Sequence, residues 1–521
     1  MFILFFILFS ASLIRLYGIK ERGLFWSDEG FFLNATKTVY AAVNFVFTKF
    51  FNHMNVPFGQ YIIENGGGYI NGAKPGHIAL EVVSFFVFGV HDYSAMILSA
   101  ISGIFSVYLV FLIINRLLGR IPGYIAALLL AISPYHVILS RSALTVSTST
   151  FFILLGVYLY LRSIDIIENR KRSNIFLLFA GLSFGYGYSC HYNLFWAICA
   201  ILIIETLYLL YFARKTIFAM REFKRILILI TGILIPILFW QGVFLLARSF
   251  LSSSHEKFLL RTYFEQIQYQ FLSAGGVSFN FHQLFYYFRF LLENEGILKF
   301  LLFLTGCIYL FIRVKENIAY LILLGFSSLP LIMYSLYFYK SPNTIMVVIP
   351  FFTMVATFGF YFLFNLTLIK NIRFAKFLPV IIIILTIFSN ILSLKNPLLS
   401  RSGYRQALGF ISQQGNYKHF TSIPPFSVFY LGAKNVYPAE RLEFSKAAQL
   451  YKEGYRYLIL DWNRYLVATE NELIAEVLKK GIQPVFSAPY RPFSTLYGND
   501  EDRELLGHSI DVYDLKNLFQ G

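Results

Sequence analysis

The sequence predicts a polytopic α-helical membrane protein with a small α/β domain at its C-terminal end. Hydrophobic residues make up 57% of the 521-residue chain and charged residues only 14%, whereas a soluble domain carries about 25% charged residues. Apolar runs of about 20 residues, long enough to cross a hydrocarbon core of roughly 30 Å, recur along the chain. After Leu394 the apolar runs give way to short strand and helix patterns.

The apolar runs predict about eleven transmembrane helices. The first run has no basic region before it and no small-residue cleavage site, so we expect a retained span and not a cleaved signal. The predicted spans lie near residues 1–18, 94–115, 121–138, 144–161, 174–188, 194–212, 226–247, 297–312, 318–337, 344–365 and 377–394.

The short loops between these spans alternate in charge, which predicts their orientation. Positively charged loops remain in the cytoplasm, so the N-terminus is expected inside, with segments 19–93, 248–296 and the chain after about 395 outside. Arg15, Lys20 and Arg22 oppose this assignment. The composition, rich in Phe, Ile, Lys and Asn, favours a prokaryotic inner (plasma) membrane. The basic loops contain clusters at 116–120, 162–172, 214–225, 313–315 and 370–376, and the opposite short loops contain only Arg141 and Lys340.

The first external segment is predicted to lie along the membrane surface. Residues 76–90 are apolar but too short to span, because a helix needs about 20 residues. Counting them as a span would also place the basic loops outside. We expect an amphipathic helix in the outer interface, with 30–51 in a similar position.

The predicted domains are a transmembrane domain, 1–395, and an external α/β domain, 396–521. Buried strands are expected at 455–460, 483–488 and 510–515, and a helix at 472–481 that ends at a glycine. Glycine-rich phosphate loops and nucleophile elbows are absent from residues 396–521. A structural or acceptor-facing role is therefore expected.

The formal charge of +16 does not indicate a nucleic-acid partner. A nucleic-acid surface needs a continuous basic stripe, and here the basic residues fall between apolar runs. The three cysteines, Cys190, Cys199 and Cys307, form neither a disulfide framework nor a C-x-x-C metal motif.

Two adjacent carboxylates, Asp28 and Glu29 in the segment LFWSDEGFF, follow the first span on its predicted outer side. A carboxylate at this position can act as a general base. The alternative is a helix start, with Ser27 or Asp28 as the cap and the acidic residues at the positive end of the helix dipole. The two interpretations are compatible.

Several cations and polar residues are expected on the same side. Lys74, before Pro75, is either a cation at lipid-phosphate level or a snorkelling lysine at a helix start. Arg141 either binds phosphate bidentately or anchors a helix end. Each of the others is by itself more typical of an interfacial anchor. They are His191 with Tyr192, His255, Arg261, Arg289 and Lys340. Close metal-ligand spacing is absent, so no metal site is assigned and a divalent metal is left open.

The ordered set of motifs resembles the GT-C glycosyltransferases, nearest to the protein O-mannosyltransferase and aminoarabinose-transferase type of glycosyltransferase family 39. The set consists of a first span, S-D-E-G, a long external loop closing on K-P, and G-V-x-D-Y-S-A before the second span. LLGRIPGYIAALLLAISPYHVILSRSA (117–143) is similar to the stretch joining spans two and three there. YKSPNTIMVVIPFF (339–352) is a looser match.

The resemblance implies an inverting hexosyl- or pentosyltransferase of the cell envelope, for example in protein glycosylation. Its donor would be a polyprenyl-phosphate sugar and its acceptor an external hydroxyl of a protein, lipid or envelope glycan. Asp28 would be the general base beside Glu29, with Lys74, and more weakly Arg141 or Lys340, at the donor phosphate. ALTVSTSTFF (143–152) lacks the acidic residue that many relatives carry there. The W-W-D-type signature of oligosaccharyltransferases is also absent.

Two other classes of membrane protein are alternatives. A transporter or flippase for lipid-linked glycans would place ionisable residues near the midplane of its spans and often contain internal repeats, whereas these spans are nearly free of charge. An envelope polysaccharide polymerase or ligase would also be multi-pass with a large external loop. It would not require the S-D-E-G to K-P order near the N-terminus.

Overall fold

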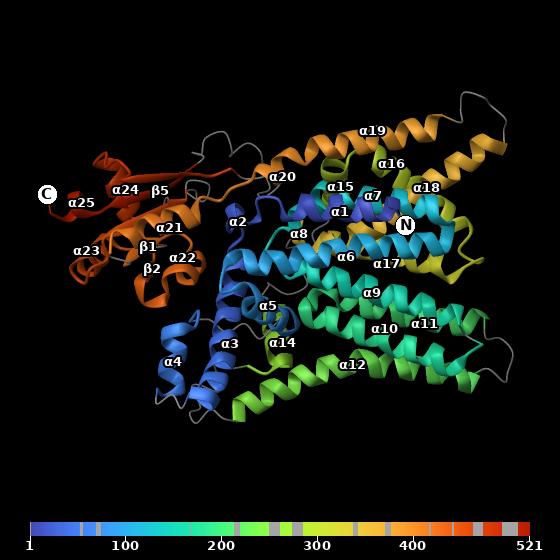
Figure 1. The fold of residues 1–521 in the computed structure, drawn as a ribbon, viewed down its shortest axis with the longest axis horizontal. Helices are drawn as coiled ribbons and strands as arrows, with labels where there is room; N and C mark the ends of the chain where they lie inside the picture. The colour runs from blue at the N-terminus through green and yellow to red at the C-terminus, as the bar shows by residue number, and fades with distance from the viewer. Residues whose placement is uncertain are drawn as a thin grey trace.

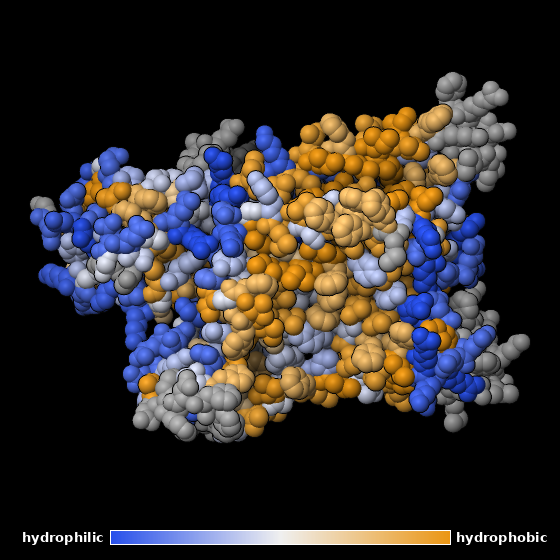
Figure 2. All heavy atoms as spheres, viewed as in Figure 1, coloured by the Kyte–Doolittle hydropathy of each residue, from blue (hydrophilic) through white to orange (hydrophobic). Residues whose placement is uncertain are grey.

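The structure, a computed structural model, is a helical bundle with a mixed β-sheet at one end (Figure 1). Figure 2 shows a continuous apolar surface over the bundle with hydrophilic residues at both ends, which is the pattern of a multi-pass membrane protein. The structure describes residues 2–52, 56–68, 74–166, 168–212, 219–249, 261–273, 285–336, 342–369, 377–415, 418–439, 442–461, 472–491 and 509–520.

The bundle contains a helix at the position of every predicted span. Its elements are α1 (Phe2–Leu16), α6 (Asp92–Leu118), α7 (Arg120–Ala131), α8 (Pro134–Ser140), α9 (Val146–Asp165), α10 (Arg170–Cys190), α11 (Phe195–Phe212), α12 (Ala219–Ser249), α16 (Ile297–Ile312), α17 (Ile318–Leu336), η3 (Pro342–Val347), α18 (Val348–Ile369) and α19 (Leu378–Ser393).

The number of spans that the described residues support is lower than eleven. Seven helices are long and apolar enough to cross a membrane, or eight if the bent pair α7 and α8 forms one span. The predicted spans at α11 and α16 contain shorter apolar helices, and α10 is not among the seven. The apolar runs predicted where the helices lie. They did not predict which of these helices are long and apolar enough to cross a membrane.

Two buried arginines stabilise the broken span formed by α7 and α8, which meet at 61°. Arg15 of α1 donates hydrogen bonds to the Ala131 carbonyl at 3.0 Å and the Leu130 carbonyl at 3.4 Å, at the end of α7. In return, Nη1 of Arg141 donates to the Ile14 and Tyr17 carbonyls at 2.9 and 2.7 Å, at the end of α1. Each arginine thus satisfies carbonyls that lack a partner within their own helix.

These contacts explain the cations that opposed the predicted orientation. Arg15 and Arg22 are both buried, so they bond within the protein and are not free loop charges. Of the three residues only Lys20 is exposed.

The first long loop lies across one end of the bundle. Helix α3 (Ser27–Asn52) runs nearly perpendicular to the bundle helices, close to α4 (Phe58–Asn65), and the sheet lies at the same end (Figure 1). Helix α5 (Pro75–Phe88) contains only 14 residues. This is shorter than the roughly 20 residues that a spanning helix needs, and the location of α3 and α5 along the membrane surface stays a prediction. The other short helices around the bundle are α2 (Ile19–Arg22), α14 (Tyr263–Ser273), α15 (Tyr286–Glu295) and α20 (Lys395–Leu399).

The chain after α20 forms a five-stranded sheet in the order β2-β1-β3-β5-β4. The β1–β2 and β1–β3 pairs are parallel, and β3–β5 and β4–β5 are antiparallel. The predicted strands and the predicted helix correspond to β3, β4, β5 and α24. The elements are α21 (Tyr404–Gln413), β1 (His419–Thr421), α22 (Pro424–Leu431), β2 (Val436–Pro438), α23 (Phe444–Lys452), β3 (Tyr457–Asp461), α24 (Glu472–Lys479), β4 (Phe486–Pro489), β5 (Ser509–Asp514) and α25 (Lys516–Phe519).

Helices α16 and α18 approach each other through two facing glycines. A Cβ atom added at Gly306 would lie 1.9 Å from the Val355 carbonyl oxygen, and one at Gly359 would lie 2.0 Å from that of Leu302. Larger residues would push the two backbones apart. Small residues at helix contacts are typical of packing between helices in membranes.

We expect Gly306→Val to lower the apparent Tm of the purified protein in detergent. The overpacked contact costs about 1–3 kcal/mol. Gly242→Val is the matched control, because a Cβ at Gly242 of α12 meets no atom within 4 Å. Equal Tm values for the two variants would contradict the close α16–α18 contact.

Candidate active site

The start of α3 is capped by the side chain of Glu29. Its Oε2 accepts hydrogen bonds from the backbone N–H groups of Phe25 at 2.6 Å and Trp26 at 3.0 Å. Glu29 is the third residue of α3, and a glutamate at this position commonly reaches back to the residue before the helix. The sequence placed the cap on Ser27 or Asp28. The structure gives that role to Glu29.

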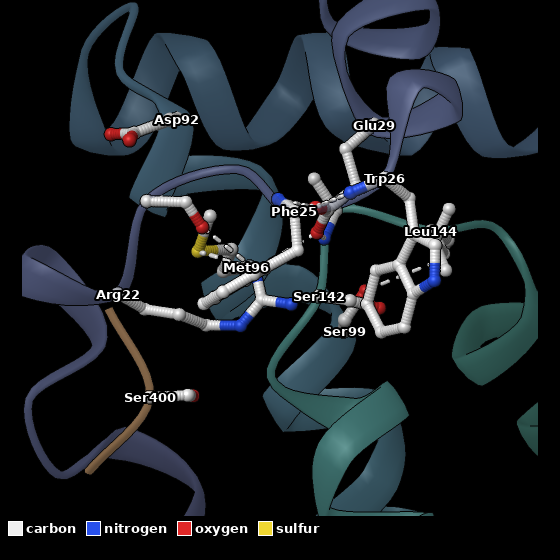
Figure 3. A network of polar contacts seen from close by, with 12 residues as sticks. Arg22, Phe25, Trp26, Glu29, Asp92, Met96, Ser99, Ser142, Leu144 and Ser400 are labelled. Atoms are coloured by element: carbon white, nitrogen blue, oxygen red, sulfur yellow. Dashed lines mark hydrogen bonds and ion pairs between the residues drawn. The ribbon is translucent and has the colours of Figure 1, made fainter. Parts of the chain in front are cut away.

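The other oxygen of Glu29 joins two distant parts of the chain. Oε1 accepts from Nη1 of Arg22 at 2.9 Å and from the backbone N–H of Ala143, in the turn between α8 and α9, at 2.9 Å. Arg22 and Glu29 are 1% and 0% exposed. The Arg22 guanidinium also lies 4.9 Å from the centre of the Phe25 ring. Figure 3 shows this network between the segment after α2 and the Ser142–Leu144 turn.

Asp28 and Glu29 therefore have different environments. Successive residues on a helix point about 100° apart. Glu29 points into the protein, whereas Asp28 is exposed and accepts no hydrogen bond from a described residue. Four hydrogen bonds occupy the Glu29 carboxylate, which gives Glu29, predicted as the neighbour of the base, a structural role. Of the pair, only Asp28 is available for chemistry.

The packing of α3 against α5 brings Asp28 toward Lys74. The two helices run parallel: Thr36 donates a 2.5 Å hydrogen bond to Glu81, and the Tyr40 and Phe85 rings lie 6.1 Å apart. Thr36 and Tyr40 are four residues apart and so share one face of α3. Continuing this face backward by four residues gives Phe32 and then Asp28. Continuing α5 backward gives Lys74, the residue that precedes its first turn.

Lys74 sits in an aromatic setting beside that face. Its Nζ lies 4.3 Å from the centre of the Phe32 ring and 5.9 Å from that of Tyr192. Burial lowers the pKa of Lys74 to about 8, and the negative charge of Asp28 opposes this shift. Among the described residues, Asp28 and Lys74 form no ion pair within 4 Å. The two charges therefore interact without neutralising each other in direct contact.

His191 and Tyr192, which follow α10, complete this group. The buried His191 ring stacks on that of Tyr192 at 5.9 Å. Burial and the nearby Lys74 and His77 hold the pKa of His191 well below its usual range, so its imidazole is neutral. Burial and Asp28 raise the pKa of Tyr192 to about 12. The Nδ1 atom of His191 has no hydrogen-bond partner among the described residues.

A second polar cluster, which the sequence analysis did not identify, joins α5 to α3 and α9. His77 Nε2 lies 3.0 Å from Glu81 Oε1, and His77 Nδ1 lies 3.2 Å from the Thr148 hydroxyl on α9. The spacing of His77 and Glu81, four residues apart after K-P, was the available signal. Because α3, α5 and α9 all contribute, this cluster holds the helix that carries Lys74 at its start.

The remaining predicted residues lie apart from this group or outside the described residues. Arg141 caps α1, and no described contact joins it to Asp28 or Lys74. The Arg261 guanidinium lies 3.5 Å from the centre of the Tyr269 ring, next to α14, and Arg289 pairs with Glu293 at 2.6 Å. Lys340 and His255 fall outside the described residues. Within the described ranges, no group of three or more His, Cys, Asp and Glu side chains is placed to hold a metal ion.

Asp28, Lys74, His191 and Tyr192 thus form the candidate active site. An exposed carboxylate can take a proton from a hydroxyl group. A partly buried ammonium beside it can stabilise a developing negative charge, because such interactions are stronger away from bulk water. Asp28 lies at the start of α3, and Lys74 directly precedes the parallel helix α5. A base and a cation at these positions are suited to a displacement reaction on a substrate bound between the two side chains.

Comparisons with known proteins agree on the kind of fold. Residues 75–240 match the family described as dolichyl-phosphate-mannose-protein mannosyltransferase. The Bacillus subtilis proteins "Putative mannosyltransferase YkcB" and "Putative mannosyltransferase YycA" are each 28% identical, over 36% and 30% of this chain. The matches span only 23% and 21% of those two proteins.

Solved structures match nearly the whole chain. ArnT from Cupriavidus metallidurans, bound to undecaprenyl phosphate, superposes with a TM-score of 0.62 at 12% identity, covering 98% of this chain and 97% of ArnT. The oligosaccharyltransferase AglB from Archaeoglobus fulgidus, in complex with an inhibitory peptide and a dolichol-phosphate, gives 0.54 at 13% identity, with 93% and 73% covered. The chain therefore has the same overall fold as ArnT and AglB.

We expect Arg22→Met to destabilise the protein strongly, because it leaves the Glu29 charge buried without its partner. Breaking a buried pair in this way costs about 3–5 kcal/mol. The control is Arg289→Met in the exposed pair with Glu293, since exposed pairs contribute only about 0–1 kcal/mol. Thermal unfolding in detergent compares the two variants, and similar Tm losses would argue against a structural role for the buried pair.

Proposed function

Starting from the GT-C fold of this chain, we propose that it is an inverting glycosyltransferase that moves a sugar from a polyprenyl-phosphate donor to an acceptor hydroxyl. Asp28 acts as the general base and Lys74 binds the donor phosphate. The observation that carries the proposal is the approach of an exposed carboxylate and a partly buried ammonium at one end of the bundle, without direct pairing. By contrast, the buried carboxylates Glu205 and Glu295 are each paired with a cation.

The reaction is a single displacement. The acceptor hydroxyl attacks the anomeric carbon of the sugar while its proton passes to the Asp28 carboxylate. A bond forms between the acceptor oxygen and the anomeric carbon, and the bond from that carbon to the phosphate oxygen breaks. The polyprenyl phosphate leaves with the bonding electrons, and the Lys74 ammonium stabilises its charge. Attack opposite the leaving group inverts the anomeric centre.

The site lies where a lipid-linked donor can reach it. Lys74 directly precedes α5, and Figure 1 shows α5 beside α3 at one end of the bundle. A lipid phosphate occupies the same level in a bilayer, and the apolar surface of the bundle accommodates its chain. The relatives described as mannosyltransferases and the ArnT structure with undecaprenyl phosphate support this donor class. The names of the relatives favour mannose as the sugar.

The proposed orientation follows the basic loops. Arg116 and Asp165, in two loops predicted to face the cytoplasm, form an ion pair at 2.6 Å. These loops therefore share one end of the bundle, opposite α3. The active site and the sheet then face the outside of the membrane, which fits an acceptor in the cell envelope.

A transporter is less well supported than an enzyme. Transporters use ionisable residues within the membrane, and the bundle does contain Glu205 and Glu295. However, Glu205 pairs with Arg225 at 2.9 Å, and Glu295 pairs with Lys299 and accepts a 2.6 Å hydrogen bond from Ser133. These paired groups join helices, whereas Asp28 and Lys74 form no ion pair with any residue that the structure describes.

We expect Asp28→Asn to lower the rate of transfer from a polyprenyl-phosphate mannose by about 100-fold or more, because the amide cannot accept the hydroxyl proton. Folding and donor binding should be largely retained. Asp165→Asn, which changes a carboxylate at the opposite end of the bundle, is the control and should transfer normally. Full activity of Asp28→Asn, measured by single-turnover transfer, would exclude Asp28 as the base.

Donor binding is expected to weaken above about pH 8, the pKa to which burial lowers Lys74. Below this pH the ammonium is charged and binds phosphate; as the pH rises through it, the neutral amine loses that attraction. Lys74→Ala should bind polyprenyl phosphate about tenfold more weakly and lose this pH dependence. The neighbouring titratable groups are Asp28, His77, His191 and Tyr192. Lys20→Ala is the control, and calorimetry across pH 6–10 gives the affinities. Unchanged affinity in Lys74→Ala would count against the assignment.

A further inference from the structure

Helix α3 has a second face, and it packs against the C-terminal sheet unit. Gly30, Asn34 and Lys37 contact α22 (Pro424–Leu431). Their spacing of four and three residues places them on one side of a helix. This side differs from the face that carries Asp28, Phe32 and Thr36 toward α5. Helix α3 is therefore held between α5 and α22.

Gly30, two residues after Asp28, is the point of closest approach. A Cβ atom at this position would lie 2.8 Å from both Cδ1 of Phe426 and Cβ of Pro425, and 2.9 Å from the Pro425 carbonyl carbon. The Pro425 carbonyl carbon is a backbone atom, so it cannot rotate away from an added methyl group as a side chain can. The glycine in S-D-E-G therefore allows α22 to pack directly against the first turn of α3.

Two side chains of α3 extend this contact by bonding the backbone of α22. Asn34 Nδ2 donates to the Pro425 carbonyl at 2.7 Å, and Lys37 Nζ donates to the Phe429 carbonyl at 3.0 Å. Phe429 lies in the last turn of α22, where carbonyls lack a partner within the helix and cations are favoured. The bonds fix the position of α3 along α22 as well as its distance.

Helix α22 is itself held from its other side. The Phe426 ring packs edge-on against that of Tyr404 at 4.8 Å, and the Tyr404 hydroxyl donates a 2.9 Å hydrogen bond to Asp461 at the end of β3. The Tyr430 hydroxyl bonds Asp92 at the start of α6. A continuous chain of contacts thus runs from the sheet through Phe426 to Gly30.

We propose that α22 holds α3 in the position that directs Asp28 toward Lys74 and the donor. Gly30, Pro425 and Phe426 are then positioning residues for the reaction, and the sheet unit has a role in catalysis without touching the substrate. This inference rests on the proposed function, because it assigns α22 a role in orienting the base.

The test is Gly30→Ala. Its methyl group should push the first turn of α3 off α22 and so change the distance and direction from Asp28 to Lys74, while Lys74 stays in place on α5. We expect kcat for transfer to fall at least tenfold and the Kd for polyprenyl phosphate to stay within twofold. Gly409→Ala is the matched control in the same unit, because a Cβ at Gly409 of α21 meets no atom within 4 Å. It should match the wild type.

A second readout does not depend on transfer. The rate at which an amine reagent modifies Lys74, followed by peptide mass spectrometry as a function of pH, reports the pKa of Lys74. Asp28 opposes the lowering of this pKa. The midpoint should therefore shift in Gly30→Ala, and this shift should be absent when Asp28 is also replaced by Asn. A change that only loosens the fold would shift the midpoint with or without the Asp28 carboxylate.

The outcomes are distinct. A folded Gly30→Ala protein with wild-type kcat and an unchanged Lys74 midpoint overturns the inference. If Gly30→Ala does not fold, Lys37→Met replaces it, with at least a threefold loss of kcat and a shifted midpoint expected, both restored by Lys37→Arg. A folded Lys37→Met protein without either change also overturns it. If the wild type transfers no sugar, the proposed function fails, and the Lys74 midpoints still decide whether α22 positions Asp28.

Discussion

The buried ion pair between Arg22 and Glu29 is the interaction on which the arrangement of the site depends. Both charges are removed from water, so the pair is favourable only because further hydrogen bonds satisfy the groups involved. Those bonds come from the start of α3 and from Ala143, after α8. The pair therefore fixes the origin and direction of α3 relative to the bundle. Once α3 is fixed, the outward direction of Asp28 follows from helix geometry.

The same principle operates at other helix ends. Arg15 of α1 bonds carbonyls at the end of α7, and Arg141, directly after α8, bonds carbonyls at the end of α1. A helix end inside a membrane protein exposes carbonyls that no water can satisfy, and a buried guanidinium supplies several donors in a fixed geometry. Arg15 and Arg22 near the first span therefore act as structural connectors, and of the three cations that oppose the predicted orientation only Lys20 is exposed.

The polar groups of the bundle then fall into two classes. Glu205 and Glu295 are paired with cations and join helices, which is the expected state of charges in a membrane protein. Among the described residues, Asp28 and Lys74 form no ion pair within 4 Å, with Asp28 exposed and the ammonium partly buried among aromatic rings. Keeping two opposite charges close but separate is unfavourable unless the rest of the structure holds them. Helices α5 and α22, on two faces of α3, supply that constraint.

The sequence alone determined the features that depend on local composition. Apolar runs located the membrane helices, and the order S-D-E-G to K-P indicated Asp28 and Lys74 together with the GT-C resemblance. Apolar runs did not fix the lengths of the helices, so eleven spans were predicted where the described residues support seven or eight.

Only the tertiary structure separated Asp28 from Glu29. Their local sequence is the same, but Glu29 finds Arg22 and the Ala143 backbone, which are close only in the folded chain. It also assigned Arg141 to a helix end, revealed the His77–Glu81 cluster, and showed why a glycine follows the two acids. Such roles depend on partners from distant segments, and burial decides which charges are paired and which are left for chemistry.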